Sequence, residues 1–74
     1  MKQLFVITND YGQGALWQRV LAESELQLKL RYRDIEVYRE VPDTIDERTA
    51  NRICSEPPLD IDDPPPAWLA MLRR

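Results

Sequence analysis

The chain has 74 residues, with 13 acidic and 10 basic side chains and a formal net charge of −3; it has one cysteine and no histidine. A chain this short forms a single domain and buries only about 60% of its unfolded surface. Without histidine, catalytic triads and most general acid–base sites lack their usual proton carrier, and histidine-based zinc sites are excluded. The composition argues against an enzyme, and we expect neither a cofactor nor a metal.

The single cysteine and the first residues bear on cellular location. Cys54 has no partner for an intramolecular disulfide, on which small secreted domains usually depend. The first apolar run, residues 4–7, is too short for the core of a signal peptide or for a membrane span. We therefore expect a cytoplasmic protein that does not insert into a membrane.

The first predicted elements are a strand and a helix. Residues 4–8 are mostly apolar and β-branched, which is typical of a central strand buried on both faces. Asp10 and Gln13 then match a helix capping box. The apolar residues that follow have the i, i+1, i+4, i+5 spacing of one helical face: Leu16, Trp17, Val20 and Leu21. This pattern predicts a helix that begins between residues 11 and 15 and ends near Ser24.

From residue 26 the apolar pattern changes to a period of two, which is typical of a half-buried strand. The alternating apolar residues are Leu26, Leu28, Leu30 and Tyr32. The alternation changes phase near Asp34, so we predict a hairpin whose second strand covers residues 35–41. One long bulged strand is an alternative. A long helix is another, because no Gly or Pro interrupts residues 15–41, but it would place residues 26, 28 and 30 on different sides.

A second helix and a proline-rich segment complete the chain. The helix begins after Pro42, with Asp43 or Thr44 as its cap, and Pro57 ends it. Residues 57–66 contain five of the six prolines and three aspartates, which predicts an extended, polyproline-like arm. Pro66 suits the start of a short amphipathic helix over residues 67–74. We therefore divide the chain into a compact domain (1–56), the arm (57–66) and this helix.

The predicted fold class is α/β (α+β): a small single domain with the element order βαββα, a short mixed sheet, and the arm ending in a short helix. In element order it partly resembles incomplete ferredoxin-like and thioredoxin-like folds. A Cys-x-x-Cys motif would support the thioredoxin-like fold, and the sequence lacks that motif.

Two candidate ligand sites carry little specific signal. The turn over residues 9–14 contains two glycines and could present N–H groups to a phosphate, but it lacks the dinucleotide-binding and P-loop patterns. An acidic group lacks the spacing and the central Gly of a calcium loop: Glu56, Asp60, Asp62 and Asp63. A plain turn explains the glycines. Solubility, or pairing with the chain's own basic residues, explains the acidic group.

Two other candidates are surfaces for a macromolecular partner. Lys29, Arg31 and Arg33 would lie about 7 Å apart on one face of the predicted strand, and we count Tyr38 and Arg39 with them. Such a row fits an anionic partner, either nucleic acid or an acidic protein surface. A solvated face, partly neutralised by acidic residues across the hairpin, is the alternative.

The C-terminal helix is the most distinctive candidate. Trp68, Leu69 and Leu72 lie on one of its faces behind a proline spacer, which suits docking into a groove of another protein. The same face could instead fold back to complete this small protein's own core. Packing against a second copy, as a homodimer, is a third possibility.

These observations predict a small non-catalytic protein-binding module that acts as an inhibitor or adaptor. In size, acidity and cytosolic character the chain looks like the small inhibitors carried by phages and mobile elements, including anti-CRISPR proteins; the resemblance is one of class, and no motif carries it. The alternative is a nucleic-acid-associated accessory protein that uses the basic side chains of residues 29–39. A small enzyme or nucleotide-binding fragment built on Gly12 and Gly14 is a third hypothesis.

Overall fold

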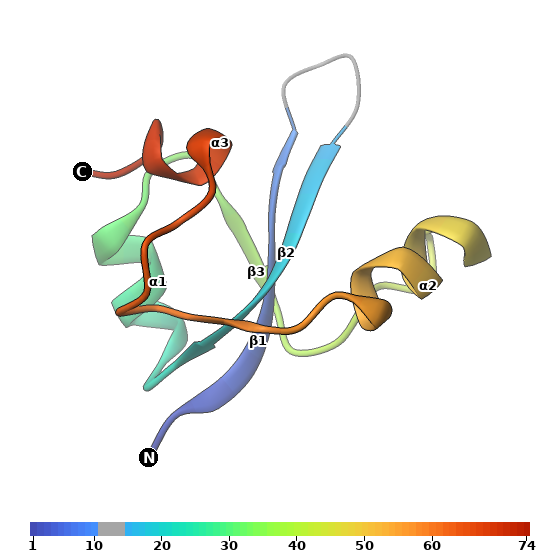
Figure 1. The fold of residues 1–74 in the computed structure, drawn as a ribbon, viewed down its shortest axis with the longest axis horizontal. Helices are drawn as coiled ribbons and strands as arrows, with labels where there is room; N and C mark the ends of the chain where they lie inside the picture. Colours follow the sequence, from blue (N-terminus) through green and yellow to red (C-terminus); the bar gives the residue numbers. More distant parts are fainter. Residues whose placement is uncertain (11–14) are drawn as a thin grey trace.

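The computed structural model describes residues 1–10 and 15–74, which form a four-stranded sheet and three helices (Figure 1). In chain order the elements are β1 (Gln3–Asp10), β2 (Ala15–Ala22), α1 (Glu25–Arg31), β3 (Glu36–Tyr38), α2 (Glu47–Ser55), β4 (Leu59–Asp60) and α3 (Ala67–Ala70). The α+β class and the mixed sheet are confirmed. The element order differs from βαββα, because two segments have exchanged their types: the first predicted helix is a strand, and the strand predicted after it is a helix.

The central strand was predicted correctly. The strands are arranged in the order β3-β1-β2-β4, so β1 has a neighbour on each side. It is antiparallel to β2 and to β3, and β4 runs parallel to β2. Residues 5–8 of β1 are all buried, as expected for a strand covered on both faces.

β2 replaces the helix predicted to end near residue 24. Helices cover both faces of the sheet, with α1 and α3 on one side and α2 on the other (Figure 1). Val20 and Ala22 belong to the core cluster, whereas Trp17 and Leu21 alternate with them and face the other side. A strand that is covered on both faces carries apolar residues on both. Its apolar residues therefore lose the two-residue period, and here they matched helical spacing.

Two predictions involve residues outside the described part of the chain. Gln13 of the predicted capping box, and both glycines of the predicted phosphate-binding turn, lie between residues 11 and 14. Asp10, the expected cap, is the last residue of β1.

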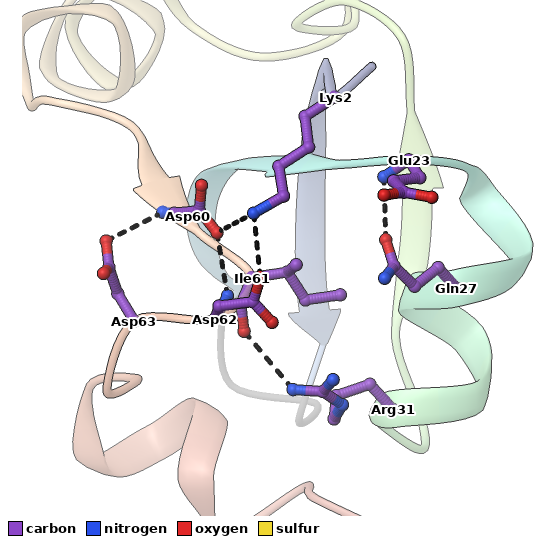
Figure 2. Close-up of polar contacts among 8 residues, drawn as sticks. All are labelled: Lys2, Glu23, Gln27, Arg31, Asp60, Ile61, Asp62 and Asp63. Atoms are coloured by element: carbon purple, nitrogen blue, oxygen red, sulfur yellow. Dashed lines mark hydrogen bonds and ion pairs between the residues drawn. The ribbon is translucent and has the colours of Figure 1, made fainter.

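α1 begins at a reciprocal cap that the strand prediction overlooked. Ser24 Oγ accepts a hydrogen bond from the backbone N–H of Gln27 at 3.0 Å. Gln27 Oε1 in turn accepts one from the backbone N–H of Glu23 at 2.7 Å (Figure 2). This arrangement is close to a capping box: it satisfies one N–H of the first helical turn, that of Gln27, and the N–H of the residue before the cap.

The two-residue apolar period gives α1 two different sides. Leu28 and Tyr32, four residues apart, are buried in the core. Leu26 and Leu30 are also four residues apart, and they lie on the opposite side, 63% and 65% exposed. The sequence pattern favoured a strand because, in a helix, the leucines of this segment would point in different directions. The segment is a helix, and its leucines do point in different directions.

The turn expected at Asp34 joins a helix to a strand. Asp34 has a φ of 56°, in the left-handed region that Asp tolerates better than most residues. β3 then pairs with β1 rather than with residues 26–32. The predicted hairpin is therefore wrong, and of the strand predicted over residues 35–41 only Glu36–Tyr38 is one.

α2 confirms the second predicted helix, although its cap lies further along the chain. Asp46, rather than Asp43 or Thr44, accepts a hydrogen bond from the backbone N–H of Thr49 at 3.3 Å. The helix ends at Ser55, ahead of the two prolines. It packs against β2 and buries Ile53.

The C-terminal segments pack on this protein's own sheet. β4 extends the edge of β2, and Ile61 is buried directly after it. α3 is shorter than the predicted 67–74 helix, and its Leu69 is fully buried. The core cluster lies between the sheet and the helices α1 and α3: Phe5, Ile7, Val20, Ala22, Leu28, Tyr32, Ile61 and Leu69. Of the alternatives for the C-terminal helix, the structure contains the fold-back onto its own core.

Candidate functional site

The C-terminal residues close onto the end of α1. Residues 31–33 and 72–74 are joined by backbone hydrogen bonds of 2.7 and 2.9 Å and by an antiparallel bridge between Tyr32 and Arg73. Two candidate sites that are far apart in the sequence, the basic residues near position 30 and the C-terminal helix, therefore meet at one junction.

This junction gathers half of the chain's basic side chains, which we call the cationic surface: Lys29, Arg31, Arg33, Arg73 and Arg74. The first three were expected in a row on a strand, and this expectation is wrong. Lys29 and Arg31 belong to α1, and side chains two residues apart diverge around a helix. They remain neighbours because the helix ends here, and the last two residues of the chain join them.

Backbone carbonyls hold three of the four guanidinium groups of this surface. Arg74 Nε donates to the C=O of Lys29 at 2.9 Å. Arg31 donates to the C=O of Ile61 at 3.3 Å (Figure 2), and Arg33 donates to the C=O of Met71 at 3.5 Å. A guanidinium has five N–H donors, so each group keeps most of its donors after this contact. The carbonyls fix the positions of the arginines without neutralising their charge.

Ion pairing also leaves the arginines unneutralised. Among residues 1–10 and 15–74, the ion pairs join Lys2 to Asp60 and Asp62, and Lys29 to Glu25. None of the eight arginines forms an ion pair with these described residues. Within the described part of the chain, Lys29 is the one member of the cationic surface whose charge is balanced by a carboxylate side chain, that of Glu25 at 3.1 Å.

The exposed side of α1 borders this charge with apolar surface. Leu30 lines an open hollow of about 360 Å³ together with Gln27, Arg31, Arg73 and Arg74. Leu26 lies one helical turn from Leu30 and is equally exposed. The site thus combines an apolar pair with the cationic surface, three of whose four guanidinium groups line the hollow.

Two carboxylates of the predicted acidic group, those of Asp60 and Asp62, pair with one lysine of the same chain. Lys2 Nζ lies 2.5 Å from Asp60 and 2.9 Å from Asp62 (Figure 2). Hydrogen bonds from Lys2 and from the backbone N–H of Asp62 lower the pKa of Asp60, and the two carboxylates raise the pKa of Lys2 above its ordinary value of 10.5. Within the described residues no group of three His, Cys, Asp or Glu is placed to hold a metal ion. The carboxylates serve to fix the N-terminal residues against the turn.

The predicted docking residues of the C-terminal helix take part in packing. Leu69 is fully buried, so a partner does not reach it in this fold. Trp68 and Leu72 are half-buried and pack against the core cluster. Trp68 also lines a hollow of about 300 Å³ with Trp17 and Pro66.

Tyr38 and Arg39 make contacts away from the chain terminus. Tyr38 contacts Trp17, with the ring centroids 6.0 Å apart, and its hydroxyl donates to Glu36 at 2.5 Å. The guanidinium of Arg39 lies 5.2 Å from the centroid of the Phe5 ring, a cation–π contact. These contacts, with Trp17, Glu36 and Phe5, lie outside the cationic surface.

Four residues of the site were not singled out from the sequence: Leu26, Leu30, Arg73 and Arg74. The leucines were assigned to the buried face of a strand, and the two arginines to the end of a longer helix. The signal available was the pattern Ser24-x-x-Gln27, which marks a helix start and would have shown that alternating leucines occupy two sides of a helix.

Comparisons of the chain with protein-family models, with curated proteins and with solved structures found no match. None of the described helices could cross a bilayer, the longest being the nine residues of α2. The functional proposal therefore rests on the geometry of the surface beside α1.

Proposed function

We propose that this protein is a non-catalytic protein-binding module that acts as an inhibitor or adaptor in the cytoplasm. Its docking surface consists of Leu26 and Leu30 together with the cationic surface, and its partner is an acidic protein. The observation that carries this proposal is the pair of exposed leucines beside arginines that have no carboxylate partner among the described residues.

The apolar part of the surface supplies affinity for a protein. Leu26 and Leu30 are 63% and 65% exposed, and burial of such side chains contributes about 1–2 kcal/mol each. Exposed leucines that stand singly are common, but a contiguous apolar pair bordered by charged side chains suits an interaction site. Arginine is enriched among the residues that dominate binding energy, so both parts of the surface suit a protein partner.

The chemistry of the site supports binding rather than catalysis. Its side chains are leucines, arginines, a lysine and a glutamine, none of which forms a nucleophile–base pair. Charge complementarity selects an acidic partner. In its small size and overall acidity the protein also resembles phage-encoded inhibitors, among them anti-CRISPR proteins. This resemblance is one of class only.

The test is affinity capture from lysate of the source cells with three forms of the full chain: wild type, the double variant Leu26→Ser/Leu30→Ser, and Leu4→Ser. Leu4 is an exposed leucine on β1, so its variant controls for loss of surface apolarity in general. The captured protein is then purified and titrated by calorimetry. We expect binding to weaken at least about tenfold in the double variant and to stay unchanged in Leu4→Ser. Equal binding by all three forms contradicts the proposal.

A nucleic-acid-associated role is the second candidate, because five cations lie together at one junction. Filter binding of an oligonucleotide over a salt series tests it. A steep linear fall of log K with log salt concentration supports this role. Absence of binding at low salt ends it.

A further inference from the structure

The hollow beside Leu30 has the chemistry of a carboxylate site. Arg31, Arg73, Arg74 and the amide of Gln27 line it, and no acidic side chain of the described residues does. Arg31 and Arg73 also line a neighbouring hollow of about 550 Å³ with Asp62 and Asp63, so Arg74 is the guanidinium group that belongs to the first hollow alone of these two. Its volume of about 360 Å³ exceeds what one carboxylate group needs, so a ligand can enter together with part of the chain that carries it. Leu30 forms an apolar wall at the same opening.

Two of the three guanidinium groups of this hollow are held by the fold before a ligand arrives, and the third has no such contact within the described residues. Arg74 and Arg31 are each fixed by a backbone carbonyl, at 2.9 and 3.3 Å. Among residues 1–10 and 15–74, the side chain of Arg73 has no hydrogen-bond or ion-pair partner. A fixed, planar guanidinium loses less side-chain entropy when it binds an anion, and it can bind a carboxylate through two parallel hydrogen bonds.

We infer that this hollow is a subsite for a Glu or Asp side chain of the partner, carried on an amphipathic segment whose apolar residues contact Leu26 and Leu30. The inference rests on the proposed function, since it defines the partner of the same surface. A nucleic-acid phosphate would also bind the arginines, but its sugar–phosphate backbone would leave both leucines in water. A protein segment with an acidic residue beside an apolar one covers both parts of the site.

Two synthetic amphipathic peptides test the subsite. One carries leucines along one side of a helix and glutamates beside them; the other has glutamine in place of every glutamate. Each is titrated into the full-length protein, and the arginine Nε–Hε signals are followed by NMR. We expect the glutamate peptide to bind about tenfold more tightly and to shift the signals of Arg31, Arg73 and Arg74.

Matched arginine variants identify the group responsible. Arg73→Gln should remove most of the difference between the two peptides, because Arg73 lines the hollow. Arg48→Gln makes the same change in charge at an exposed position of α2 and should leave the difference intact. Thermal melts check that both variants are folded.

The outcomes separate this inference from the proposed function. If the two peptides bind equally well to the wild type and neither binds to Leu26→Ser/Leu30→Ser, the carboxylate subsite is overturned. The proposed docking surface is then still supported. Binding of neither peptide also overturns the subsite, while the capture experiment still decides the docking function. Tighter binding of a thymidine oligonucleotide than of the glutamate peptide assigns the hollow to phosphate and overturns the protein carboxylate.

Discussion

The two sides of α1 have nearly the same composition and opposite environments. Leu28 and Tyr32 are buried in the core, at 0% and 2% exposure, while Leu26 and Leu30 remain 63% and 65% exposed. The charged groups also differ in their pairing: Asp60 and Asp62 pair with Lys2, whereas the arginines beside the exposed leucines form no ion pair with the described residues. The fold uses one side of the helix and leaves the other exposed, and we propose that a partner covers it.

The largest expected effect is on the stability of the protein, which should depend on the buried side of α1 and hardly at all on its exposed side. Leu28→Ala should lower the free energy of unfolding by about 3 kcal/mol, because it leaves a cavity in the core. Leu30→Ala should change it by less than about 0.5 kcal/mol, because that side chain is mostly in water. Urea denaturation measures both values. Similar losses in the two variants would show that the exposed side also supports the fold.

The second largest effect on stability should come from the backbone of residues 71–74, and not from the charges of Arg73 and Arg74. Deletion of residues 71–74 removes the two backbone hydrogen bonds to residues 31–33, three more that close the C-terminal turn, and the packing of Leu72. It should cost at least about 2 kcal/mol. Arg73→Gln/Arg74→Gln keeps the backbone and should cost less than about 0.5 kcal/mol. If the double variant is as unstable as the deletion in the same urea experiment, the arginines are structural rather than reserved for a ligand.

The helix cap supports both sides of α1 and should have an intermediate effect. Ser24→Ala removes the hydrogen bond to the backbone N–H of Gln27 and should cost about 1 kcal/mol. Ser55→Ala is the control, since this exposed hydroxyl donates only to a carbonyl at the end of α2. Thermal melts that rank the variants in the reverse order would contradict the assigned cap.

The smallest expected effect is the contribution of the ion pair between Lys2 and Asp60 to stability. The Lys2 pair lowers the pKa of Asp60, so its contribution to stability is present above the ordinary Asp pKa of 3.8 and is lost as the pH falls through the lower, folded value. The stability difference between wild type and Lys2→Met should therefore be constant near neutral pH and shrink in acid. Arg73→Gln, which breaks no ion pair with the described residues, should show no such change. A difference for Lys2→Met that does not vary with pH would contradict the pairing.

Only those elements whose local signals were unambiguous could be predicted from the sequence. Residues 4–8 are apolar at every position but the last, so the central strand was found. The prolines at 57 and 58 fixed the end of α2. Periodicity failed where tertiary packing set the pattern, because β2 has two covered faces and α1 has a second apolar side that the core does not use.

The candidate site was predicted in part and for a reason that proved wrong. Lys29, Arg31 and Arg33 were selected as a row on a strand, and the structure groups them at a helix end instead. Arg73 and Arg74 join them through contacts across about 40 residues of chain, which no local pattern reveals. The exposed leucines were hidden by the same two-residue period that suggested a strand.

The central claim is that the exposed side of α1 is the binding side. A photocrosslinking amino acid placed at position 30, in complex with the captured partner, tests it most directly, with the same amino acid at position 4 as the control. We predict a crosslink from position 30 to an apolar residue next to an acidic one in the partner, and none from position 4. A crosslink from position 4 alone, with position 30 silent in a folded complex, would contradict the account.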